Sequence, residues 1–203
     1  MENITGVILA GGRSERMGVD KATLRIQGET LFERQLNAFR EVFPRVLIAG
    51  DRPDLASPEV PCVPDLYPGS ALGGLYTGLS TAGTPYIFAA PCDMPLPDTD
   101  MIRFIVSCRT SAYDAVVPRT SAGMEPLFAV YSRKCLPVMK SLLEEGNYRV
   151  LDIYERVNVL FIEEDSLPPG WERALLNINT RENLEHVMLD IEFKTRHDRT
   201  FND

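Results

Sequence analysis

The most informative stretch of the chain is a loop that combines glycines with basic side chains directly after an apolar run. Gly11 and Gly12 end that run, and Arg13, Arg16 and Lys21 follow within the same loop. Because glycine has no Cβ, backbone N–H groups can come close to a ligand there, and the cations add positive charge. A nucleoside triphosphate suits this combination, although the spacing is neither that of a Walker loop nor that of a dinucleotide fingerprint. A solvated loop with glycine turns is the alternative, and Arg13 fits a solvated charge equally well.

Side chains for acid–base chemistry are scarce. The only histidines, His186 and His197, lie near the C-terminus, so we expect catalysis by positioning and electrostatics rather than by a histidine-activated nucleophile. Asp93 follows an apolar strand, where a carboxylate is poorly solvated unless it has a partner. Because Mg²⁺ prefers one or two carboxylates plus phosphate oxygens and water, this residue alone can be the protein's metal ligand. The alternative is a turn or helix-capping aspartate ahead of Pro95 and Pro97.

Composition limits the class of protein. The 203 residues carry a net charge of -8, with 44% hydrophobic and 25% charged residues, which is typical of one soluble domain. The acidic balance argues against nucleic acid and anionic membranes as partners, and no apolar run approaches the ~20 residues of a membrane span. The four cysteines are far apart and the N-terminus has no signal-peptide pattern, so we expect a cytoplasmic protein with reduced thiols. Residues 13–25 nonetheless carry a local charge of +2.

The order of the apolar runs predicts the elements that position these side chains. Strand-like runs lie at 6–10, 46–49, 60–63, 86–90 and 114–117, and helical patterns at 31–42, 72–82 and 98–108. Further along, 127–131 and 157–162 read as strands and 134–145 as a helix, and Thr180 is placed to cap a last helix from 181 to about 190. Strands that alternate with helices predict a mostly parallel, twisted sheet. We therefore expect a single three-layer α/β/α domain over residues 1–190, with ligands at the carboxyl ends of its strands, and a mobile tail over 191–203.

The loop also carries a recognisable pattern. From Leu9 to Lys21 it reads L-A-G-G-x-x-x-R-M-G-x-D-K, which resembles the signature of the nucleotidyltransferases that act on molybdenum cofactor, and of the guanylyltransferases among them in particular. Relatives that transfer CMP generally read L-A-A-G and lack the Asp before the Lys. The runs P-C-D-M-P around Asp93, E-P-L-F-A-V-Y from Glu125 and N-I-N-T from Asn177 resemble further stretches of the family. The likeness covers nearly the whole chain and implies a Rossmann-like nucleotidyltransferase fold; it departs at 70–74 and at 181, where relatives carry prolines.

The resemblance implies a reaction in which the terminal phosphate of molybdopterin attacks the α-phosphorus of GTP and pyrophosphate leaves. The nucleophile arrives with the substrate and needs no deprotonation at neutral pH, which agrees with a chain almost without histidine. On this resemblance Lys21 contacts the α-phosphate, Arg16 holds the β- and γ-phosphates, and Asp93 binds Mg²⁺. These three residues are the expected catalytic set.

The resemblance also implies contacts to the two substrates. The expected nucleotide-binding residues are Leu9, Ala10, Gly11, Gly12, Lys21, Asp65 and Asp93. Asp65 would accept from guanine or ribose, or else lies in a surface turn. Asn177 and Asn179 are two residues apart on an extended segment, so their side chains would point the same way, toward the metal or the pterin. The alternative is that they serve as capping residues. Arg149 is either a ligand of the molybdopterin phosphate or an exposed arginine.

Two alternatives remain at this stage. The first is a cytidylyltransferase that acts on the same cofactor, because base choice depends on shape. The second is a nucleotide-binding regulator that has kept the fold and lost transfer, although Arg16, Lys21 and Asp93 form a full transfer set. The expected partners are GTP and molybdopterin, with transient contacts to molybdenum cofactor insertion proteins or acceptor molybdoenzymes.

Overall fold

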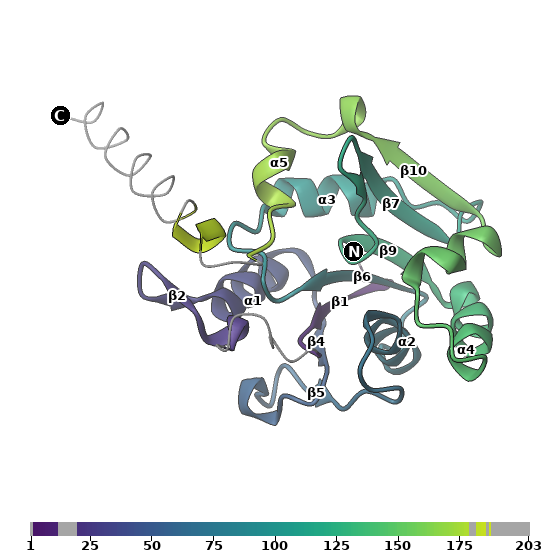
Figure 1. Cartoon of the computed structure of the whole chain (residues 1–203), viewed down its shortest axis with the longest axis horizontal. Coiled ribbons are helices and arrows are strands. Elements are labelled where there is room, and N and C mark those ends of the chain that lie inside the picture. The colour runs from purple at the N-terminus through teal and green to yellow at the C-terminus, as the bar shows by residue number, and fades with distance from the viewer. Residues whose placement is uncertain (1, 12–19, 179–181, 186, 188–203) are drawn as a thin grey trace.

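The computed structural model describes residues 2–11, 20–178, 182–185 and 187, and it shows a sheet covered by helices on both faces (Figure 1). The strands are ordered β10-β7-β9-β6-β1-β4-β5 across the sheet, and β8 pairs with β7. This arrangement confirms the predicted three-layer architecture. The predicted cap at Thr180 and the tail over 191–203 lie outside the described residues, while 182–185 and 187 are helical.

The first half of the chain forms parallel strands around β1 (Ile4–Leu9), whose residues are all buried. β1 pairs with β4 (Val46–Ala49) on one side and with β6 (Tyr86–Pro91) on the other, both parallel. β5 (Cys62–Val63) continues the parallel sheet beyond β4. Burial on both faces explains why these strands are short continuous apolar runs.

The second half of the chain reverses one strand. β9 (Ala129–Ser132) is antiparallel to β6 and to β7 (Ala115–Thr120), and β7 is parallel to β10 (Val159–Glu163). The short β8 (Gly123–Met124) is also antiparallel to β7. The beginning of β9 therefore lies at the same edge of the sheet as the carboxyl ends of β1 and β6.

The helices fill the outer layers. α1 (Leu31–Val42) and α3 (Thr99–Ser107) pack together, as do α2 (Ala71–Thr81) and α4 (Leu136–Glu144), and α5 (Trp171–Ala174) is a single turn. α1 has the predicted bounds because a capping box starts it: the Glu33 N–H donates to Thr30 Oγ1 at 3.0 Å and the Thr30 N–H donates to Glu33 Oε2 at 2.7 Å.

A small hairpin precedes α1 and was not predicted. β2 (Arg25–Ile26) and β3 (Glu29–Thr30) pair antiparallel, and the turn between them places Gln27 at φ 51° and Gly28 at φ 90°. Two residues with positive φ are the mark of a tight hairpin turn, which glycine at the second position favours. The predicted helix over 134–145 is also split, since Arg133–Cys135 form a 3₁₀ turn before α4 begins.

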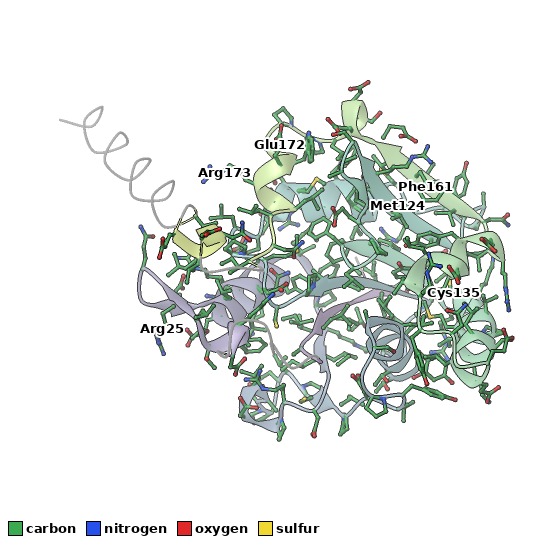
Figure 2. All side chains as sticks on the ribbon, in the orientation of Figure 1. Arg25, Met124, Cys135, Phe161, Glu172 and Arg173 are labelled. Carbon is green, nitrogen blue, oxygen red and sulfur yellow. The ribbon has the colours of Figure 1, made fainter. Side chains whose placement is uncertain are left out.

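Each face of the sheet has its own core. On the α1–α3 side four phenylalanine rings contact one another, mostly edge to face or tilted, with ring centroids from 4.9 to 5.7 Å apart: Phe39, Phe43, Phe88 and Phe128. On the α2–α4 side the buried side chains include Tyr131 and Cys135, the latter marked in Figure 2. No helix in the described part of the chain has the length and apolar character to cross a membrane.

Candidate active site

An ion pair joins two of the predicted catalytic residues at the carboxyl edge of the sheet. Lys21 Nζ lies 2.8 Å from Asp93 Oδ2, and the two side chains are only 16% and 20% exposed. Partial burial strengthens the attraction relative to an ion pair in water. The structure thus brings together the loop after β1 and the turn after β6, as the sequence predicted.

Backbone contacts fix the turn that carries Asp93. The Cys92 N–H donates to the Leu9 carbonyl at 3.1 Å, and the Ile178 N–H donates to the Asp93 carbonyl at 3.1 Å. The helix-capping alternative is excluded because Asp98, not Asp93, caps α3 and accepts from the backbone N–H groups of its first turn. The carboxylate of Asp93 is therefore directed to its ion pair with Lys21 rather than to a helix cap.

Lys21 is positioned by a 3₁₀ turn, Lys21–Thr23, whose cap is Asp20. Asp20 accepts from the Ala22 N–H at 3.1 Å and pairs with Arg52 at 2.8 Å. Arg52 also pairs with Asp54 at 2.7 Å, and the hydrogen bonds that the guanidinium donates to this carboxylate, more than its interaction with Asp20, raise the pKa of Arg52 further. Arg52 therefore anchors the start of the Lys21 turn.

Sequence reasoning missed Arg52. The available signal was its place just after β4, at the same edge as the other cations. Nothing in the spacing connected it to Asp20, which is far away along the chain.

Asp65 has an unsatisfied carboxylate. Its Oδ1 is buried and has no hydrogen-bond partner within the described chain, which excludes a simple exposed turn. Burial, and secondarily the charge of Asp51, raise the pKa of this carboxyl group. Its Oδ2 lies so close to Gly11 that a Cβ there would be 2.6 Å away, so glycine is required for the loop to pass over the carboxylate. A buried acceptor of this kind suits a ligand that supplies N–H or O–H donors.

The remaining predicted residues are placed unevenly. The Leu9 carbonyl and the Ala10 N–H already take part in sheet hydrogen bonds, with Cys92 and Ala49, so nucleoside contacts from this segment would come from other backbone groups. Gly12, Arg13, Arg16 and Asn179 lie outside the described residues.

The two predicted substrate-side residues within the described chain have local partners. The Asn177 amide donates to the Leu175 carbonyl at 3.3 Å, and the next residue, Ile178, donates its N–H to the Asp93 carbonyl at 3.1 Å. Arg149 is exposed and lies 3.7 Å from Asp152 across an ion pair. Its turn packs against α4.

The described residues contain no group of three or more His, Cys, Asp or Glu side chains arranged to hold a metal ion. The donor set at Asp93 is a single carboxylate already opposed to a cation, Lys21, at 2.8 Å. A carboxylate that attracts an ammonium ion also suits a hard divalent cation whose other ligands are phosphate oxygens and water. The residues at Asp93 therefore fit a divalent cation bound together with a nucleotide.

Comparison with known proteins gives consistent matches. The family model described as the MobA-like NTP transferase domain matches residues 6–159. A relative named probable molybdenum cofactor guanylyltransferase, from Pelotomaculum thermopropionicum, is 35% identical over 91% of this chain and 91% of its own. The structure of molybdopterin-guanine dinucleotide biosynthesis protein A from Archaeoglobus fulgidus superposes with a TM-score of 0.82, at 22% identity, over 93% of this chain and 98% of its own. A Mycobacterium tuberculosis protein solved in complex with manganese has the same fold, with a TM-score of 0.66 at 21% identity over 92% of this chain and 98% of its own.

Proposed function

We propose that this chain, which belongs to the MobA-like NTP transferase family, is a molybdenum cofactor guanylyltransferase: it transfers GMP from GTP to molybdopterin and releases pyrophosphate. The observation that carries the proposal is the pairing of Lys21 with Asp93, at 2.8 Å, at the carboxyl edge of the sheet. A regulator that only binds nucleotide does not need a cation and a metal-binding carboxylate converging on one point.

The reaction requires little acid–base catalysis from the protein. A phosphate monoester is largely dianionic at neutral pH and attacks phosphorus directly. The protein must align two anionic substrates and stabilise the charge that develops as pyrophosphate leaves. We assign Lys21 to the α-phosphate and Arg16 to the β- and γ-phosphates. Asp20 and Arg52 position Lys21 through the 3₁₀ turn.

Asp93 would hold a divalent cation, which we propose to be Mg²⁺. When bound, the ion neutralises phosphate charge and polarises the phosphoryl oxygens. Lys21 can leave the carboxylate for the phosphate, because its flexible stem lets one ammonium reach alternative partners.

Asp65 supports GTP as the donor. Guanine presents N1–H and an amino group side by side, so a carboxylate can accept from both. Cytosine presents an amino group beside the acceptor N3, which a carboxylate repels. The buried Oδ1 of Asp65, which has no hydrogen-bond partner among the residues that the structure describes, is a suitable acceptor for the guanine edge. Leaving it unpaired with the wrong base costs the free energy of an unsatisfied buried group.

Other contacts stay predictions. Leu9, Ala10, Gly11 and Gly12 would serve the nucleoside through their backbones. Asn177, Asn179 and Arg149 would face molybdopterin or the metal. Transient contacts with insertion proteins or acceptor molybdoenzymes, and a cytoplasmic location, rest on the resemblance alone.

The test is pyrophosphate release by the purified protein with Mg²⁺, molybdopterin and either GTP or CTP. We expect release with GTP, dependent on molybdopterin, and formation of the guanine dinucleotide. Faster turnover with CTP would refute the guanylyl assignment. Nucleotide binding without any transfer would instead support the regulator.

A further inference from the structure

One half-buried carboxylate near the site has no part in the chemistry above. Glu125 lies between β8 and β9, and within the described chain its side chain has no hydrogen-bond or ion-pair partner. Burial raises the pKa of its carboxyl group, with no opposing contribution from a neighbour. A carboxylate in this position is costly to the fold unless it accepts hydrogen bonds from something else.

The strand register places Glu125 close to the catalytic edge. Val130 of β9 pairs with Val116 of β7 and with Phe88 of β6, so the three share one row across the sheet. The Glu125 N–H donates to the carbonyl of Pro118 at 3.0 Å, further along β7 toward its carboxyl end. Glu125 therefore lies next to β7, in line with β9 and before that strand begins. Seen from the Asp93 turn, it is on the side opposite to β1.

The pleat indicates the face on which Glu125 lies. Met124, labelled in Figure 2 beside β7, packs against the core of the α2–α4 side. Glu125 follows the last residue of β8, and its N–H continues the ladder with β7 through the Pro118 carbonyl, so we infer from the alternation of side chains that it lies on the opposite face. Ala174 and Leu175 pack into the core of that same face, and the chain continues from them through Asn177 to the hydrogen bond with Asp93. Glu125 therefore shares a face of the sheet with the segment predicted to meet the acceptor.

Asp65 and Glu125 stand on opposite sides of the Lys21–Asp93 pair. Asp65 approaches Gly11 at the end of β1, whereas Glu125 lies in the line of β9, two strands away, or about 10 Å at the usual strand spacing. Both are desolvated carboxylates. The two substrates of the proposed reaction share one chemical feature, since guanine and a pterin each carry a ring N–H beside an exocyclic amino group.

From these observations we propose that Glu125 recognises the acceptor: its carboxylate accepts hydrogen bonds from the amino-pyrimidine edge of the pterin, as Asp65 does from guanine on the donor side. This assignment rests on the proposed function and names the residue that holds the end of molybdopterin remote from the reacting phosphate. Glu125 is a binding residue and touches no reacting atom.

The test measures the steady-state dependence on each substrate for the wild-type protein and for Glu125→Gln. Glutamine keeps the shape but removes the charge and one acceptor, so we expect kcat/KM for molybdopterin to fall about 10- to 100-fold, the usual effect of losing a charged hydrogen bond. The KM for GTP should stay unchanged, which also shows that the variant is folded.

The matched control is Glu144→Gln, which removes an exposed carboxylate of α4 that pairs with Lys140; it should leave kcat/KM for both substrates unchanged. Equal molybdopterin kinetics in Glu125→Gln and wild type would overturn the assignment, as would a change confined to GTP. A wild-type protein that transfers no GMP to molybdopterin would refute the proposed function instead, so the two failures are distinguishable.

Discussion

The Lys21–Asp93 ion pair predicts how the protein binds metal. Because the ammonium lies 2.8 Å from the carboxylate, a cation on Asp93 competes with Lys21. Replacing Lys21 by methionine removes the competitor and keeps a similar stem. The side chains are 16% and 20% exposed, so the pair is worth about 1–2 kcal/mol, between the values for exposed and buried pairs. Lys21→Met should therefore bind Mn²⁺ about 5- to 30-fold more tightly in the absence of nucleotide.

The measurement is a titration in which the electron paramagnetic resonance signal of free Mn²⁺ reports binding. The control variant, Lys140→Met, removes a lysine from an exposed pair with Glu144 at 3.6 Å and should bind Mn²⁺ like the wild type. Transfer by Lys21→Met should nonetheless fall on the order of 100-fold or more, since the cation that stabilises the transition state is gone. Equal or weaker Mn²⁺ binding by Lys21→Met would refute the competition.

Three further predictions address the same edge of the sheet. Asp93→Asn should fold, as judged by circular dichroism, yet lose metal-dependent transfer by about 100-fold or more; normal turnover would exclude Asp93 as the metal ligand. Gly11→Ala places a Cβ 2.6 Å from Asp65 Oδ2 and should lower the free energy of unfolding by about 1–3 kcal/mol in urea titrations. An unchanged free energy of unfolding would mean that the loop shifts to make room for the methyl group. Burial raises the pKa of Asp65 above its unfolded value, so this group favours the fold below the unfolded pKa and loses that contribution as pH rises through the folded one. Asp65→Asn should therefore be more stable than wild type at pH 7 but not in acid, and should discriminate less between GTP and CTP; unchanged stability at both pH values would contradict the account of burial.

Much of the fold could be predicted because periodicity and breakers agree along the first half of the chain. The helix over 31–42 has its predicted bounds, and the strands β1, β4 and β6 lie within one or two residues of the predicted runs. The direction of β9 could not be predicted, because a short apolar run has the same appearance in a parallel or an antiparallel strand. The β2–β3 hairpin was missed because each strand has only two residues and leaves no alternation to detect.

The candidate site shows a similar division. The resemblance assigns Lys21 and Asp93 to one site, and the pattern of elements agrees, because both residues follow buried strands whose carboxyl ends meet at one edge of a parallel sheet. The role of Arg52 depends on its contact with Asp20, which no local pattern encodes. Asp65 was named only by resemblance; its burial and missing partner arise from the close approach of Gly11, which is a tertiary feature. Glu125 begins the E-P-L-F-A-V-Y run that resembles the family, but its position relative to Asp93 depends on the antiparallel direction of β9.

The hydrogen bond from Ile178 to the Asp93 carbonyl also orders events in time as the chain is synthesised. β1 and β6, the strands that precede the Lys21 and Asp93 turns, leave the ribosome well before residue 178, so the sheet can assemble while the Asp93 turn still lacks this contact. The last part of the chain then closes the turn. A polypeptide that stops before residue 178 would have these strands but would lack the hydrogen bond that holds the Asp93 turn, so a contact made late in synthesis completes the site.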